Sequence, residues 1–119
     1  MMRPSNELPE VYLCTAPVDF RKGIQGLAVL VEADLALDPF SEQLFVFTNR
    51  RRDSVKILYW ERNGFCLWQK RLERERFQWP ADFGRAPVTL TGQQLNWLLD
   101  GYDIRQLRPH KALKYKSLL

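Results

Sequence analysis

The stretch "VKILYWERNGFCLWQKRL" (residues 55–72) decides the fold, because two runs of strand-forming residues flank the dipeptide Asn63-Gly64. Asn-Gly tolerates the positive φ angles of a tight turn and is a strong signal for a β-hairpin. With Asn63 and Gly64 as the two loop residues, Lys56 lies opposite Arg71. The sequence therefore predicts an antiparallel hairpin.

The two faces of this hairpin differ, because successive residues of a strand point to opposite sides. One face is mainly apolar and is the predicted core face; it holds Val55, Ile57, Tyr59, Cys66, Trp68 and Leu72, with Glu61 and Lys70 as charged members. The other collects Lys56, Leu58, Trp60, Arg62, Phe65, Leu67, Gln69 and Arg71. The second face is therefore a mixed basic and aromatic surface.

Patterns outside the hairpin predict the remaining elements. Strands are expected at 10–15 and 42–48, the latter buried on both faces because its apolar run is nearly continuous. Apolar residues at steps of three or four predict a helix over 19–36 with Asp19 as its N-cap. "RFQWP" (76–80) is a candidate for one more short strand.

A second helix is predicted near 91–100, where Thr91 and Gln94 have the spacing of a capping box and Gly101 fits the position after the helix. The expected fold class is α+β: a mostly antiparallel sheet of four or five strands. The longer helix packs on one face and the short C-terminal helix closes an end.

The chain of 119 residues predicts a single domain, 1–119, with an ordered core at about 10–102 and a basic tail at about 103–119. It contains no run of eighteen apolar residues, which a transmembrane helix would need. The first ten residues lack the apolar region of a signal peptide. We therefore expect a cytoplasmic protein without a membrane partner.

The charge is unevenly distributed along the chain. Residues 1–47 have a balance of −4, whereas residues 48–76 have +5 and residues 77–119 have +3. Such asymmetry favours an anionic partner, nucleic acid before membrane, because no amphipathic basic helix accompanies it. The alternative is a basic surface that serves only solubility.

The sequence gives little support for a metal site or a catalytic nucleophile. The two cysteines, Cys14 and Cys66, are far apart and His110 is the one histidine, so the usual zinc spacings are missing. Acids for a two-metal nuclease exist, but most lie beside a cation, which favours surface pairing; they are Asp19, Asp34, Asp38, Asp53, Glu61, Glu73 and Glu75. We expect no catalytic residues, no metal and no cofactor.

The loop with three consecutive arginines is the best candidate binding site. Arginine suits phosphate because its planar fork binds two oxygens at once. Trp60 could stack on an unpaired base, although packing under a helix is the alternative. The residues predicted to hold DNA are Arg50, Arg51, Arg52, Lys56, Arg62 and Arg71, with Trp60 beside them. They would contact phosphates and not read the sequence.

The chain also resembles a known family in "VDFRKGIQGL" (18–27), in 38–80 and in "LTGQQLNWLLDG" (90–101). The family is the TnpB-like accessory protein, from the second open reading frame of bacterial insertion-sequence-66 transposons. Asp19, Arg21 and Lys22 match its first motif. Glu75 departs from it, since members often have glycine there.

This resemblance implies a part in transposition beside a separate, larger transposase that does the strand chemistry. It implies no catalytic residue. The expected function is therefore a non-catalytic DNA-binding accessory protein. One alternative is a protein-interaction module whose basic face docks the transposase, and a weaker one is a metal-dependent nuclease.

Overall fold

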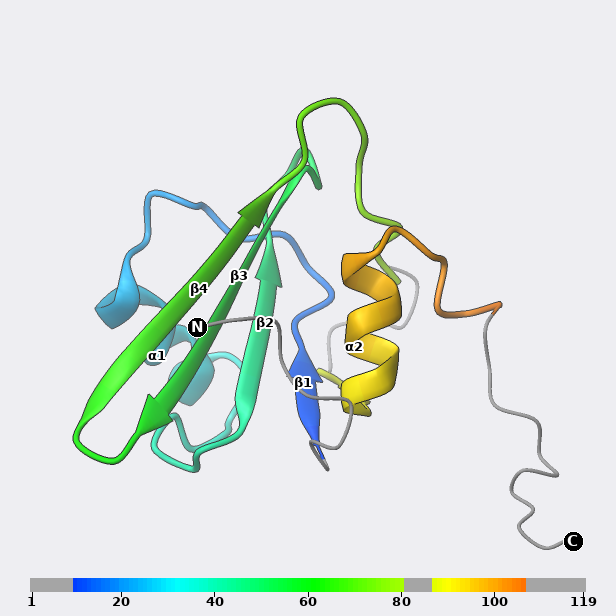
Figure 1. The fold of residues 1–119 in the computed structure, drawn as a ribbon. Helices are drawn as coiled ribbons and strands as arrows, with labels where there is room; N and C mark the ends of the chain where they lie inside the picture. Colours follow the sequence, from blue (N-terminus) through cyan, green and yellow to red (C-terminus); the bar gives the residue numbers. More distant parts are fainter. Residues whose placement is uncertain (1–9, 81–86, 107–119) are drawn as a thin grey trace, which may run out of the picture.

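The computed structural model describes residues 10–80 and 87–106, which form one five-stranded sheet with two helices (Figure 1). The strands are β1 (Val11–Leu13), β2 (Leu44–Thr48), β3 (Ser54–Glu61), β4 (Gly64–Arg71) and β5 (Val88–Leu90), in the order β4-β3-β2-β1-β5. β1 and β2 run parallel, and the other neighbours are antiparallel. The predicted α+β fold with a mostly antiparallel sheet is confirmed.

The two helices cover opposite faces of the sheet. Helix α1 (Ile24–Ala33) connects β1 to β2 and buries Leu27 and Val31 against β2 and β3. Helix α2 (Gly92–Leu99) follows β5 and buries its leucines against the other face, together with Phe77, Trp79 and Ile104. All five residues of β2 are buried, as its continuous apolar run predicted. The sheet is thus a central layer with a core on each side.

The hairpin forms, but its predicted register is wrong. Glu61 pairs with Gly64, so that Arg62 and Asn63 are the loop residues and Arg62 takes the positive φ of 59°. The shift places Lys56 opposite Gln69, which avoids the like-charge pair that the predicted register required. Because the shift is two residues, every side chain keeps its expected face.

The start of α1 also differs from the prediction. The N-cap is Gly23, which has no side chain to cap the helix. Asp19 lies in a separate turn, where its carboxylate accepts the backbone N–H of Arg21 at 2.9 Å. The helix begins later than the predicted 19–36, because the carbonyls of Phe20 and Lys22 accept other hydrogen bonds, described below. It also ends earlier, at Ala33.

The segment 76–80 is not a strand, so that prediction is wrong. Its side chains serve the core instead: Phe77 and Trp79 are buried, and the Trp79 Nε1–H donates to the Cys14 carbonyl at 3.0 Å. The fifth strand is β5, a three-residue segment that pairs with β1.

The ends of α2 agree with the sequence. Thr91 and Gln94 form the predicted capping box, and Gly101 follows the helix with a φ of 100°. The Lys70 amine donates to the Leu99 carbonyl at 2.9 Å, which puts a cation at the negative end of the helix dipole. His110 and the rest of the predicted tail from 107 onward lie outside the described residues.

Candidate nucleic-acid interface

Three segments that are distant in sequence meet at one edge of the sheet. The parallel strands β1 and β2 end at the same edge, and β4 runs in the same direction because both it and β2 are antiparallel to β3. The segments that leave these strands, 14–22, 49–53 and 72–76, therefore lie together, at the top in Figure 1. We call the cations of this region the basic edge; they are Arg21, Lys22, Arg50, Arg51, Arg52, Arg71, Arg74 and Arg76.

The arginine loop of this edge has a defined conformation. The Asn49 side chain donates to the Asp53 carboxylate at 2.7 Å and accepts the backbone N–H of Ser54 at 3.3 Å. The hydrogen bond from Asn49 lowers the pKa of Asp53, and the nearby charge of Arg51 adds to the effect. Arg52 completes the turn with a φ of 61°. A fixed loop loses less conformational entropy when it binds a ligand.

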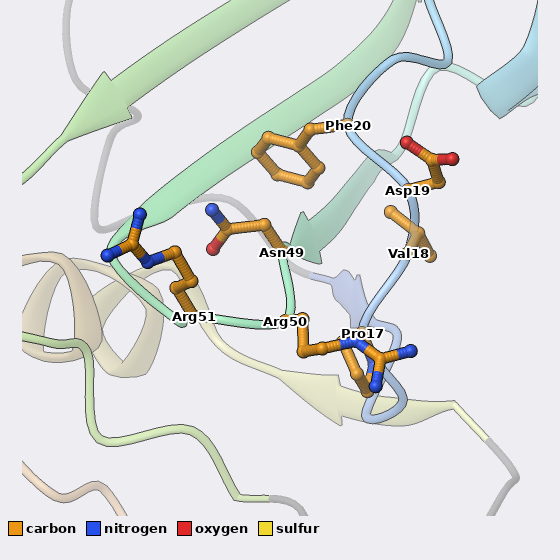
Figure 2. A pocket seen from close by; sticks show the side chains of 7 residues that line it. All are labelled: Pro17, Val18, Asp19, Phe20, Asn49, Arg50 and Arg51. Atoms are coloured by element: carbon orange, nitrogen blue, oxygen red, sulfur yellow. The ribbon is translucent and has the colours of Figure 1, made fainter.

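The loop presents two of its arginines to solvent. Arg50 and Arg51 are exposed, whereas Arg52 is half-buried and its carbonyl accepts the N–H of Phe77 at 2.7 Å. Figure 2 shows that the Arg50 and Arg51 side chains leave the loop in different directions. Both guanidinium groups are therefore accessible to an anion.

The first family motif lies beside this loop, where the backbone N–H of Val18 donates to the Thr48 carbonyl at 2.9 Å. The Asp19 carboxylate pairs with the Arg21 guanidinium at 2.6 Å. Hydrogen bonds from the side chain and the backbone N–H of Arg21, together with its charge, lower the pKa of Asp19 to about 2. Asp19 thus fixes the position of an arginine that is itself 90% exposed in its side chain.

A pocket of about 350 Å³ lies between the two segments (Figure 2). Its lining residues are Pro17, Val18, Asp19, Phe20, Asn49, Arg50 and Arg51. Apolar side chains of Pro17, Val18 and Phe20 lie beside two guanidinium groups, and the one carboxylate already has a cationic partner. Such a lining is suited to an anionic group attached to an apolar body.

Lys56 does not belong to the exposed surface, and the expectation of an open basic face is wrong at this position. Its side chain is 7% exposed and lies 4.7 Å from the centre of the Phe20 ring. The amine donates to the carbonyls of Phe20 at 2.9 Å and Lys22 at 3.0 Å. These bonds keep residues 20–22 out of the helix and anchor the segment that carries Arg21 to the sheet.

The remaining predicted DNA-binding residues are divided between the two ends of the hairpin. Arg71 pairs with Ser54 and lies at the basic edge. Arg62 lies in the hairpin turn, directly after Glu61, which is seven residue steps from Ser54, or about 23 Å at ~3.3 Å per residue. Trp60 is at the same far end, with its ring 5.0 Å from those of Phe40 and Phe65. The structure thus separates Arg62 and Trp60 from the arginine loop.

The basic edge also contains cations that the sequence argument did not select. The sequence indicates a family motif for Arg21 and Lys22 and no DNA-binding role for Arg74 and Arg76. All four are exposed. Their alternation with acids, as in Glu73-Arg74-Glu75-Arg76, favoured a surface of ion pairs. Within the described ranges, however, no ion pair joins Arg74 or Arg76 to a carboxylate.

Residues 10–80 and 87–106 show neither a metal-binding cluster nor a membrane-spanning helix. No group of three or more His, Cys, Asp or Glu side chains in these ranges could hold a metal ion. The same ranges contain no helix with the length and apolar character to cross a bilayer. Both cysteines are free.

Comparisons with known proteins cover most of the chain. The model of a family described as "IS66 Orf2 like protein" matches residues 9–109. Two similar proteins of Sinorhizobium fredii (strain NBRC 101917 / NGR234) are y4hO, 38% identical over 104 residues, and y4jC, 40% identical over 103. The matches span 87% of this chain, with 90% of y4hO and 86% of y4jC. No solved structure matches.

Proposed function

Because this chain belongs to the IS66 Orf2-like family of insertion-sequence accessory proteins, we propose that it serves transposition by binding DNA through the basic edge. It would act in the cytoplasm and perform no strand chemistry of its own; a separate transposase of the same element would do that. The observation that supports the proposal most directly is the meeting of three cationic segments at one edge of the sheet.

The charges at this edge favour phosphate as the ligand. It has eight cations against four carboxylates, Asp19, Asp53, Glu73 and Glu75. Asp19 pairs with Arg21, and Asp53 accepts a hydrogen bond from Asn49, so two of these acids have partners within the protein. The exposed guanidinium groups of Arg50, Arg51 and Arg71 are left to bind phosphate oxygens.

The geometry also indicates what kind of binding to expect. The cations come from loops and a strand end, with no helix or strand among them that could enter a groove and read bases. Contacts of this kind position a protein on the DNA backbone. We therefore expect strong salt dependence and little sequence preference from this chain alone.

Two single variants with the same charge change test the proposal. Arg50→Glu removes a cation of the basic edge, whereas Arg62→Glu does so at the far end of the hairpin. Fluorescence anisotropy with a duplex of the element's terminal repeat, and with a scrambled duplex, measures affinity across a salt series. We expect Arg50→Glu to weaken binding about tenfold and to reduce the slope of log K against log salt by ~0.9. Arg62→Glu should stay within about twofold.

Each other outcome argues against the proposal in a specific way. Equal losses in the two variants would mean that only net charge matters. A terminal-repeat preference in the unmodified protein would mean that this chain reads bases. Absence of binding at low salt would remove the nucleic-acid role, leaving the basic edge as a docking surface for an acidic protein.

A further inference from the structure

A second candidate surface lies on the outer side of α1, away from the arginine loop. Ile24, Val29 and Phe40 have 38%, 56% and 55% of their surface exposed. In the described chain these are three of the four large apolar side chains so exposed, and the other is Tyr102. The three border one pocket of about 330 Å³. We call them, with the pocket between them, the α1 patch.

The α1 patch has a rigid floor. Phe40 contacts two other rings, with centroids 5.0 Å from Trp60 and 5.3 Å from Phe65, and Trp60 and Phe65 are 5.0 Å apart. Phe40 is therefore held in position although more than half of it faces solvent. Fixed, exposed aromatic residues are typical anchors of protein interfaces, since little freedom is lost when a partner covers them.

The charge around the patch restricts the identity of the partner. Residues 24–49 contain four acids and no lysine or arginine. Glu32 lines the pocket and has no ion pair among the described residues. Symmetric pairing of two copies through this surface would bring like charges together, and a nucleic acid would be repelled. The β3–β4 hairpin turn adds little net charge, because the positive charge of Arg62 directly follows the negative charge of Glu61.

We propose that the α1 patch binds a segment of a partner protein that presents apolar side chains between lysines or arginines. The apolar side chains would enter the pocket over Phe40, and a cation would pair with Glu32. A helix with this pattern fits a groove of such composition. This surface shares no residue with the basic edge, so the inference does not depend on DNA binding.

Synthetic peptides of leucine and lysine at helical spacing provide a defined probe. A peptide with glutamate in place of lysine is its matched control. Titration followed by ¹³C-methyl NMR should shift the Ile24 and Val29 signals with the leucine–lysine peptide, with affinity about tenfold above that of the glutamate peptide. Glu32→Gln should reduce this difference, because it removes the carboxylate that selects the cation.

Protein variants then test the location. Val29→Ser should weaken binding about tenfold, or ~1.4 kcal/mol, because it removes an apolar contact at the pocket. Tyr102→Ala is the control, since Tyr102 is 54% exposed but lies outside the patch. Equal losses in both variants, or equal affinity for the two peptides, would overturn the proposal. Self-association of the protein that Val29→Ser abolishes would also overturn it, because a second copy would then be the partner.

Discussion

Replacing the buried amine of Lys56 is the sharpest test of how the basic edge is built. The Lys56→Met variant keeps most of the apolar length of the side chain and removes both hydrogen bonds to the carbonyls of Phe20 and Lys22. Hydrogen bonds from a charged group contribute about 1.5–3 kcal/mol each. The lower value applies here, because Lys22 is exposed and water can replace the amine at its carbonyl.

Two bonds at the lower value give a loss of about 3 kcal/mol in the free energy of unfolding. For a domain of this size, such a loss lowers Tm by roughly 12 °C. Urea denaturation followed by tryptophan fluorescence measures the free energy directly. Amide hydrogen exchange should increase at residues 20–22 in particular, because these lose their anchor while the sheet remains intact.

Two further substitutions serve as controls for the size of the stability loss. Gln69→Met changes the exposed cross-strand neighbour of Lys56 and should alter stability by less than ~0.5 kcal/mol. Lys70→Met removes one bond to the Leu99 carbonyl and should cost about half as much as Lys56→Met. The reasoning is refuted if Lys56→Met is as stable as the unmodified protein but binds DNA more weakly. That result would describe an exposed amine that contacts phosphate.

Three other substitutions have expected outcomes. Trp79→Phe removes the hydrogen bond to the buried Cys14 carbonyl and should lower the free energy of unfolding by about 2 kcal/mol in urea denaturation; a change below ~0.5 kcal/mol would contradict the assigned bond. Thr91→Ala removes the capping box and should cost ~1 kcal/mol in the same assay, whereas Thr91→Ser should cost less. Asp19 should titrate at about pH 2 by carboxyl ¹³C NMR and move toward 3.8 in Arg21→Gln; because its folded pKa is depressed, this carboxylate favours the folded state above the unfolded pKa, an effect lost as pH falls toward 2.

Local signals predicted the elements that depend on local chemistry. The capping box of Thr91 specified the start of α2, and the continuous apolar run of 42–48 indicated a strand buried on both faces. β5 was missed because three residues are too few to show a period. The Asn63-Gly64 signal predicted the wrong hairpin register, because a turn signal does not include the repulsion between Lys56 and Arg71 across the strands.

The candidate site was predicted only in part, because its composition depends on contacts between distant segments. The exposed arginines of 50–51 could be seen from their sequence alone. The burial of Lys56 could not, since lysine is rarely buried and its two acceptors are main-chain carbonyls that carry no sequence signal. The segments that carry Arg21 and Arg50 lie together because β1 and β2 pair in parallel. Nothing in the sequence of either strand indicated that pairing.

The position of β1 in the sheet has a consequence for synthesis on the ribosome. β1 lies between β2 and β5, and Val11 pairs both with Leu44 and with Leu90, far along the chain. The hairpin of β3 and β4 can form as soon as it emerges, because its contacts are local. β1 must wait for β5 before both of its edges are paired. A nascent chain shorter than this therefore has an exposed strand edge, a site where partly made copies can pair wrongly.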